Sequence, residues 1–281
     1  MRPLGDWHEI LPKLGADASV VLHSGCAQPR RLVRQLASHA PALRGVRVYS
    51  LMPMGECPHA APPIAGEHLT LTTFFPGKGL REAVNAGRAE VRRTPLSEIP
   101  GLFERGILKA DLLFLQVSRP DVSGRMSLGI SVDYLRTVLE LDPIVVAEVN
   151  PWMPRTAGDT LLRSDQVDFV VDAEGPPQTV ASAPSDPADE QIADHVASLI
   201  PHGAVLQAGI GALPDLVLSR LGHLRDLGVH TGIITDSLLP LLRRGVVTNA
   251  TKHRFRGRCV TTMAAGSQAL YAFLDDNPEV E

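Results

Sequence analysis

Short runs of apolar, often β-branched residues alternate along this chain with longer segments in which apolar residues recur every three or four positions. Runs of the first kind are typical of buried strands, and segments of the second kind are typical of amphipathic helices. The predicted strands cover residues 18–23, 46–51, 69–74, 110–117, 144–149 and 167–171. Residues 29–39 have the helical spacing, with Leu32, Val33, Leu36 and Ala37 on one side. The alternation predicts an α/β fold with a mostly parallel sheet.

The composition changes between residues 172 and 191, where Pro, Ala, Ser and acidic residues dominate. Such a stretch is typical of an exposed connection. After it the pattern predicts a helix from about Asp189 to Leu199, a strand at 204–207, a helix at 214–221 and a strand at 229–235. We therefore expect an N-terminal domain at residues 1–175, a linker at 176–188 and a second α/β domain at 189–281.

Charge and composition exclude several classes of protein. The chain has 31 acidic and 27 basic residues and a net charge of −4, so no overall basic field favours a nucleic acid partner. No apolar run reaches the roughly 18 residues of a membrane-spanning helix, and the first residues do not have the order of a signal peptide. We expect a cytoplasmic protein without membrane association. Cys26, Cys57 and Cys259 are scattered, which predicts reduced thiols and no metal site.

Two glycines, Gly209 and Gly211, separate a predicted strand from a predicted helix. Glycine lets the backbone approach a ligand, and free N–H groups at a helix start favour the negative charge of a thioester oxyanion or a phosphate. G-x-G without a third glycine is not the dinucleotide fingerprint, which argues against a nucleotide-binding domain. Taken alone, the motif is more simply interpreted as a tight turn that needs positive φ.

Longer sequence blocks point to a family. They are Phe74–Gly87, Leu96–Pro100, Gln116–Ser118, Ser127–Tyr134, Ala147–Asp159, Leu206–Pro214, Val229–Thr231 and Asn277–Glu281. In this order they resemble blocks of the acetyl-CoA hydrolase/CoA-transferase family, in particular 4-hydroxybutyrate CoA-transferases. The most specific block, Ala147–Asp159, is similar to the family's run E-V-N-P-x-M-P-R-T-x-G-D.

The resemblance implies two similar open α/β domains with the active site in the cleft between them. Members transfer CoA between carboxylic acids or hydrolyse acyl-CoA, so acyl-CoA and small carboxylic acids are the expected ligands. CoA is then a substrate, and no permanently bound cofactor or metal is expected. In the transferases a glutamate attacks the thioester and forms first an anhydride and then a glutamyl-CoA thioester. By the same resemblance the substrate-binding residues are Gln207, Gly209, Ile210, Gly211, Asn150, Met153 and Arg155.

The sequence departs from the family pattern at two places. Gly232 occupies the position of the nucleophilic glutamate after the His-Thr pair, so the catalytic residues are unknown. Relatives also continue well beyond the block that ends at Glu281. We therefore expect a C-terminally shortened chain with an incomplete second domain.

Other polar residues are weak catalytic candidates. His230 lies two positions before Gly232, and residues two apart share one face of a strand, so it could hold a water molecule. Asp236 is expected to cap the helix that follows it. Glu148 is expected to form a structural pair with Arg155. Cys26 could be a nucleophile at a helix start, but no base partner is evident.

We interpret the chain as an acyl-CoA-handling protein, by resemblance a hydrolase or transferase, that has lost the transferase nucleophile. The alternative is a non-catalytic subunit or interaction module. In that case a second copy or a second chain would cover an exposed sheet edge and apolar surface. The fold alone does not choose between these hypotheses.

Overall fold

The computed structural model describes residues 1–15, 17–182 and 184–281. Its internal contacts divide the chain into two compact units. Unit 1 contains Met1–Met153 and Thr160–Gln178, and unit 2 contains Pro154–Asp159 and Thr179–Glu281. The biological domain boundaries at 1–175, 176–188 and 189–281 remain a prediction.

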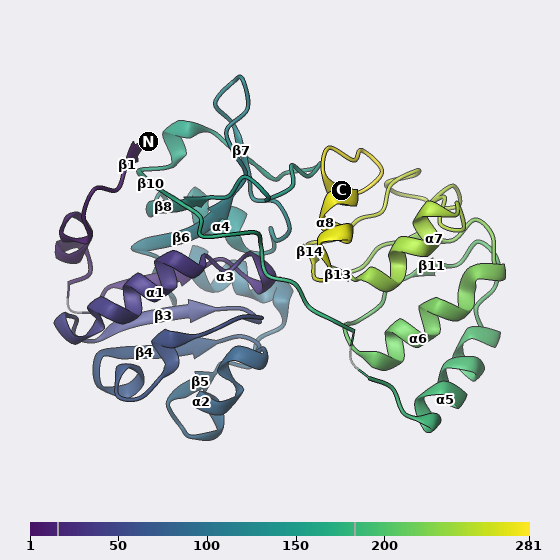
Figure 1. The fold of residues 1–281 in the computed structure, drawn as a ribbon, viewed down its shortest axis with the longest axis horizontal. Coiled ribbons are helices and arrows are strands. Elements are labelled where there is room, and N and C mark those ends of the chain that lie inside the picture. The colour runs from purple at the N-terminus through teal and green to yellow at the C-terminus, as the bar shows by residue number, and fades with distance from the viewer. Residues whose placement is uncertain (16, 183) are drawn as a thin grey trace. The chain divides into compact units, whose positions relative to one another are not determined.

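Unit 1 is built around one eight-stranded sheet in the order β1-β10-β8-β6-β2-β3-β4-β5, in which every neighbouring pair is parallel. Its strands are β1 (Arg2–Pro3), β2 (Ser19–Leu22), β3 (Val46–Ser50), β4 (Leu69–Thr73), β5 (Ala89–Val91), β6 (Leu112–Val117), β8 (Ile144–Val149) and β10 (Phe169–Asp172). A separate antiparallel pair joins β7 (Met126–Ser127) to β9 (Leu161–Leu162). The predicted mostly parallel α/β fold is thus confirmed, and Figure 1 shows the sheet with its flanking helices.

Both faces of the sheet in unit 1 are covered. The helices are α1 (Arg30–His39), α2 (Arg81–Asn85), α3 (Ile99–Glu104) and α4 (Leu135–Glu140). Leu32 and Leu36 of α1 join Val20 of β2 in the main hydrophobic cluster. On the opposite face the ring of Phe103 in α3 meets Tyr49 of β3 edge-on. Strands buried on both faces read as continuous apolar runs, as β6 does.

Unit 2 contains shorter elements. They are α5 (Pro187–Ser198), β11 (Val205–Leu206), α6 (Ala212–Arg220), β12 (Gly228–Val229), β13 (Ile233–Ile234), α7 (Leu239–Arg243), β14 (Met263–Ala264) and α8 (Gln268–Leu274). β11 pairs with β12, and β13 pairs with β14, both in parallel. Helix α5 begins two residues before the expected start because the side chain of Asp186 caps it and Pro187 occupies its first turn.

The strand predicted at residues 229–235 is interrupted, so this prediction was wrong in detail. The chain leaves β12 after Val229 and begins β13 at Ile233, where it changes its pairing partner from β11 to β14. The hydroxyl of Thr231 donates to the backbone oxygen of Ala208 at 2.8 Å. The backbone N–H of Thr231 also bonds the oxygen of Val260 at 2.9 Å, so the backbone pairing continues as far as Thr231. Gly232 therefore lies in a connection between two strands. Within the described residues, no helix is long and apolar enough to cross a membrane.

Candidate functional site

The G-x-G segment of unit 2 connects β11 to α6. Gly211 is the residue before the helix, and Asp215 donates its backbone N–H to the oxygen of Gly211 at 3.2 Å. Because Pro214 has no N–H, the first turn of α6 offers the N–H groups of Ala212 and Leu213. Gln207, Gly209 and Ile210 are exposed. The turn thus presents backbone donors at a helix start, an arrangement that favours a negatively charged ligand atom.

The two glycines of this turn have different backbone conformations. Gly211 has φ +142° and ψ 169°, a region that is essentially limited to glycine. Gly209 has no positive φ, and a Cβ placed on it would meet nothing within 4 Å. Positive φ therefore explains the glycine at 211 but not the glycine at 209.

We expect Gly211→Ala to destabilise unit 2 by about 1–3 kcal/mol, because alanine must adopt the strained conformation. Gly209→Ala should change the stability by less than about 1 kcal/mol, since neither its backbone nor the surrounding space resists a methyl group. Urea unfolding of the two variants, measured beside the wild type, checks this difference. Equal losses of stability in both variants would contradict the explanation by the backbone conformation of Gly211. For ligand-binding experiments Gly209→Ala is consequently the cleaner probe of the turn.

Gly232 lies in open surroundings. It is exposed, its φ is not positive, and a Cβ built on it would meet no atom within 4 Å. Its carbonyl oxygen accepts a hydrogen bond from Thr262 Oγ1 at 2.9 Å, which fixes the backbone without using the side-chain position. The local structure thus places no requirement for glycine here.

His230 is exposed and precedes Gly232 by two residues. Its ring meets the ring of Phe255 edge-on, with centroids 5.8 Å apart. His230 still forms a parallel bridge with Val260, but the chain bends at Gly232, so the two residues do not belong to one regular strand. A packing role beside Phe255 accounts for the observed contact of His230.

Asp236 has a capping role, but for a different helix from the expected one. Its carboxylate accepts the N–H of Ser267 at 2.8 Å and the hydroxyl of the same residue at 2.8 Å. Ser267 is the N-cap residue of α8, whereas the turn that begins at Asp236 has Thr235 as its N-cap residue. Asp236 therefore holds the start of α8.

A cavity of about 110 Å³ lies beside the G-x-G turn and includes a carboxylate that the sequence analysis did not single out. It is lined by Val180, Ala181, Ser182, Ile210, Gly211, Asp215, Thr235, Asp236 and Ala265. The Oδ1 atom of Asp215 accepts hydrogen bonds from Thr235 Oγ1 at 3.1 Å and Ser237 Oγ at 2.6 Å. The sequence feature that could have indicated Asp215 is its place in the first turn of the predicted helix, four positions after Gly211.

Glu148 at the end of β8 is buried and caps α1 in unit 1. Its Oε2 atom accepts the backbone N–H of Arg31 at 2.9 Å and of Leu32 at 3.3 Å. Burial raises the pKa of the Glu148 carboxyl to about 7, against the opposing effect of these two bonds. Arg155 belongs to unit 2. Its backbone N–H donates to Asp275 Oδ1 at 2.8 Å, and its Nε atom lies 3.9 Å from Asp276 Oδ1. Glu148 and Arg155 belong to different units, so their expected pairing remains a prediction.

Asn150 is fully buried, and all its side-chain polar atoms are bonded. Its Nδ2 donates to Gln116 Oε1 and to the oxygen of Gly175, both at 2.8 Å, and its Oδ1 accepts the N–H of Trp152 at 2.9 Å. Met153 is also buried, with 4% exposure. These bonds hold the loop after β8 and use both N–H groups of the Asn150 side chain. The assignment of Asn150 and Met153 to substrate binding remains a prediction.

Cys26 follows β2 in a short helical turn and is fully buried. A thiol without solvent access is a poor nucleophile. The structure therefore gives no support to a catalytic Cys26.

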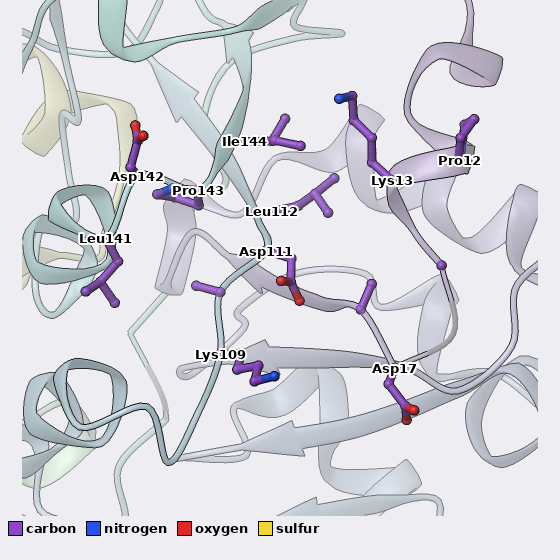
Figure 2. A pocket seen from close by; sticks show the side chains of 13 residues that line it. Pro12, Lys13, Asp17, Lys109, Asp111, Leu112, Leu141, Asp142, Pro143 and Ile144 are labelled. Carbon is purple, nitrogen blue, oxygen red and sulfur yellow. The ribbon is translucent and has the colours of Figure 1, made fainter.

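A pocket of about 710 Å³ in unit 1 lies where β2, β6 and β8 begin. Figure 2 shows Lys13, Asp17, Lys109 and Asp111 around it. Ligands of open parallel sheets bind at the carboxyl ends of the strands, which are at the opposite edge. Asp111 instead accepts the N–H of Ser19 at 2.8 Å and so serves the fold. In the described part of the chain, no group of three or more His, Cys, Asp or Glu side chains is placed to hold a metal ion.

Comparison with known proteins identifies the family. The model of the acetyl-CoA hydrolase/transferase N-terminal domain matches residues 2–181. 4-hydroxybutyrate coenzyme A transferase of Clostridium kluyveri is 34% identical over 287 residues, which cover 98% of this chain and 67% of the relative. Succinyl-CoA:acetate/propanoyl-CoA:succinate CoA transferase of Fasciola hepatica is 34% identical over 267 residues, which cover 94% and 55%. The chain thus spans between about half and two thirds of the length of these relatives.

Solved structures agree with this result. RipA from Yersinia pestis superposes with a TM-score of 0.88 at 28% identity and covers 97% of this chain and 66% of that protein. 4-hydroxybutyrate CoA-transferase from Porphyromonas gingivalis gives a TM-score of 0.81 at 28% identity and covers 98% and 68%. The sequence blocks, the parallel α/β fold and these matches together show that the chain belongs to the acetyl-CoA hydrolase/transferase family.

Proposed function

We propose that this chain binds acyl-CoA thioesters and hydrolyses them slowly, without transferring CoA to a second acid. The observation that carries the proposal is the open, exposed Gly232 at the position where the resemblance requires a glutamate. A carboxylate at that position is the covalent carrier that transfer needs. Without it, water can attack the thioester carbonyl, the carbon–sulfur bond breaks, and a carboxylic acid and the CoA thiol leave.

The G-x-G turn supports the binding part of the proposal. The N–H groups at the start of α6 are suited to the thioester oxygen, whose negative charge grows as water attacks. Relatives named as CoA transferases support CoA thioesters and small carboxylic acids as the ligand class. The position of the thioester between the two units and the cytoplasmic location remain parts of the proposal that rest on the sequence.

The test is to incubate the purified chain with acetyl-CoA and a second carboxylic acid such as butyrate. We expect free CoA to appear slowly, no butyryl-CoA to form, and no peptide to be labelled when hydroxylamine or borohydride traps covalent intermediates. Gly209→Ala, which we expect to leave the fold intact, should weaken acetyl-CoA binding because its methyl group would occupy space that the ligand needs beside the turn. Mass spectrometry of the CoA esters and of the digested protein reads out both parts. Formation of butyryl-CoA by the wild type would reject the proposed loss of transfer.

A second candidate is a subunit completed by another polypeptide, either a further copy or a different chain. Within the described residues β11 pairs with β12 alone, and Val205 in β11 is 51% exposed. In unit 1, by contrast, strand β2 is fully buried and lies between β3 and β6. An open strand edge with an exposed apolar residue favours pairing with a further strand. Failure of the purified chain to bind any acyl-CoA would favour this candidate.

A further inference from the structure

Basic residues are concentrated in one part of unit 2. Between residues 237 and 274 the sequence contains no aspartate or glutamate. The same stretch contains six basic residues, Arg243, Arg244, Lys252, Arg254, Arg256 and Arg258. The whole chain has a net charge of −4, so this stretch is locally opposite to the rest. A local excess of one sign of charge raises the concentration of oppositely charged ligands near it.

The four basic residues 252–258 belong to a loop, residues 250–258, that we call the basic loop. Its shape is fixed from inside by Lys252, which is buried and donates from Nζ to the oxygens of Val229 at 2.8 Å and Arg258 at 2.6 Å. The N–H of Gly257 bonds the oxygen of Asn249 at 3.1 Å and closes the loop. Lys252 thus ties the basic loop to β12, and its ammonium group is not directed at solvent.

The outer side of the basic loop presents two arginines and an aromatic ring. Arg254 and Arg256 are exposed, and no hydrogen bond or ion pair with another described residue engages their side chains. Phe255 between them has φ +53° and is 43% exposed. Arg258 differs, because its Nη1 atom lies 3.0 Å from Glu281 Oε2. Two available guanidinium groups therefore flank a partly exposed ring.

The basic loop lies next to the segment that contains Gly232. The Phe255 ring contacts the His230 ring, and the centroids are 5.8 Å apart. Soon after the loop, Thr262 donates its hydroxyl to the oxygen of Gly232 at 2.9 Å. The basic loop therefore lies beside Gly232, the position where the family resemblance requires the nucleophile.

We propose that the basic loop binds the adenosine 3′-phosphate 5′-diphosphate portion of CoA, with Arg254 and Arg256 on phosphate oxygens and Phe255 against the adenine. This inference rests on the proposed function and adds a site to it. Guanidinium groups form strong paired hydrogen bonds to phosphates. An aromatic ring provides a face on which a base stacks. A nucleic acid would offer the same groups, but two free arginines in an acidic chain provide far less charge than backbone binding needs.

The test compares ligands that share parts of CoA. Calorimetric titration uses CoA, adenosine 3′,5′-bisphosphate, inorganic pyrophosphate and pantetheine, which lacks the nucleotide. Arg254→Ala with Arg256→Ala should weaken the binding of CoA and of the bisphosphate by about tenfold or more, and should leave pantetheine unaffected. Phe255→Leu should weaken the bisphosphate but not pyrophosphate. The matched control is Arg93→Ala with Arg105→Ala, which removes the same charge from exposed positions of unit 1.

The outcomes separate this inference from the proposed function. If the wild type binds CoA and the loop variant binds it equally well, the basic loop is rejected and the proposed function stands. If the bisphosphate binds through the loop but acetyl-CoA is not hydrolysed, the loop site stands and the proposed chemistry fails. Binding of neither CoA nor the bisphosphate to the wild type rejects both. Tighter binding of a single-stranded RNA than of CoA overturns the assigned ligand. Arg254→Lys with Arg256→Lys should retain part of the affinity, which a general loss of folding would not.

Discussion

Gly232→Glu is expected to give the chain a covalent acyl carrier that the wild type lacks at this position. The new side chain enters open space on an exposed residue whose backbone conformation suits any residue type. The stability should therefore change by less than about 1 kcal/mol. With acetyl-CoA the introduced carboxylate can attack the thioester carbonyl, release the CoA thiolate and form a mixed anhydride. The thiolate then attacks the glutamyl carbonyl of this anhydride, acetate leaves, and a glutamyl-CoA thioester forms.

The experiment for Gly232→Glu traps the protein with borohydride or hydroxylamine and locates the modified peptide by mass spectrometry. Label on residue 232 in this variant, with none in the wild type, is the expected result. Gly232→Gln is the matched control, because it has the same size but no nucleophilic carboxylate. Label on Glu148 or Cys26 in the wild type would show that another residue carries the acyl group. A folded Gly232→Glu protein that binds acetyl-CoA but remains unlabelled would reject the assigned nucleophile position.

Glu148→Gln is expected to change the stability of unit 1 in a pH-dependent way. Relative to the wild type, the variant should be more stable at pH 8 than it is at pH 4.5. The pKa of the Glu148 carboxyl is raised from 4.5 to about 7 by burial. A raised carboxyl pKa means that its stabilising contribution is present below pH 4.5 and is lost as the pH rises to about 7. Because glutamine does not ionise, the variant avoids this loss, which amounts to about 3 kcal/mol. Its amide oxygen can still accept the N–H groups of Arg31 and Leu32.

The measurement is urea unfolding at several pH values between 4.5 and 8, with Trp7 as the reporter of unit 1. Trp7 is 4% exposed and packs edge-on against Phe114, so its fluorescence changes when this core opens. Replacing Trp152 by Phe in both proteins removes the second, exposed tryptophan. Burial also lowers the pKa of His23 and His59 to about 4, but both proteins contain these groups, so their effect cancels in the comparison. A difference between variant and wild type that does not change with pH would refute the buried-charge explanation.

The sheet of unit 1 could be predicted from the sequence because its central strands are buried on both faces. The prediction for Ile144–Val149 matches β8 residue by residue, and that for 110–117 contains β6. The edge strands β1 and β5 were missed because they have two and three residues, too few for a period to be visible. The break after Val229 was missed for another reason. It follows from a change of pairing partner, from β11 to β14, which a local sequence pattern does not show.

For the candidate site, sequence reasoning found the family and the turn but not the partners of individual side chains. The sequence suggested Arg155 as a partner of Glu148, but it gave no sign of the helix start that Glu148 caps, which is 117 residues away. Asn150 was assigned to the substrate because it belongs to a family motif, and that motif gave no sign of its internal bonds to Gln116, Gly175 and Trp152. The basic loop was missed because a net charge averages over the chain and hides a local excess.

The division of the chain has a consequence for how such proteins can be recombined. The backbone passes from unit 1 to unit 2 at Pro154, returns at Thr160 and leaves again after Gln178. The short first visit is anchored in unit 2, where Arg155 bonds Asp275 through its backbone. Neither unit is therefore a contiguous cassette. A gene chimera joined at the Pro-rich connection would take residues 154–159 from one parent and the surface they dock on from the other. Functional exchange of halves between relatives therefore requires two further crossovers, one at each end of this six-residue segment.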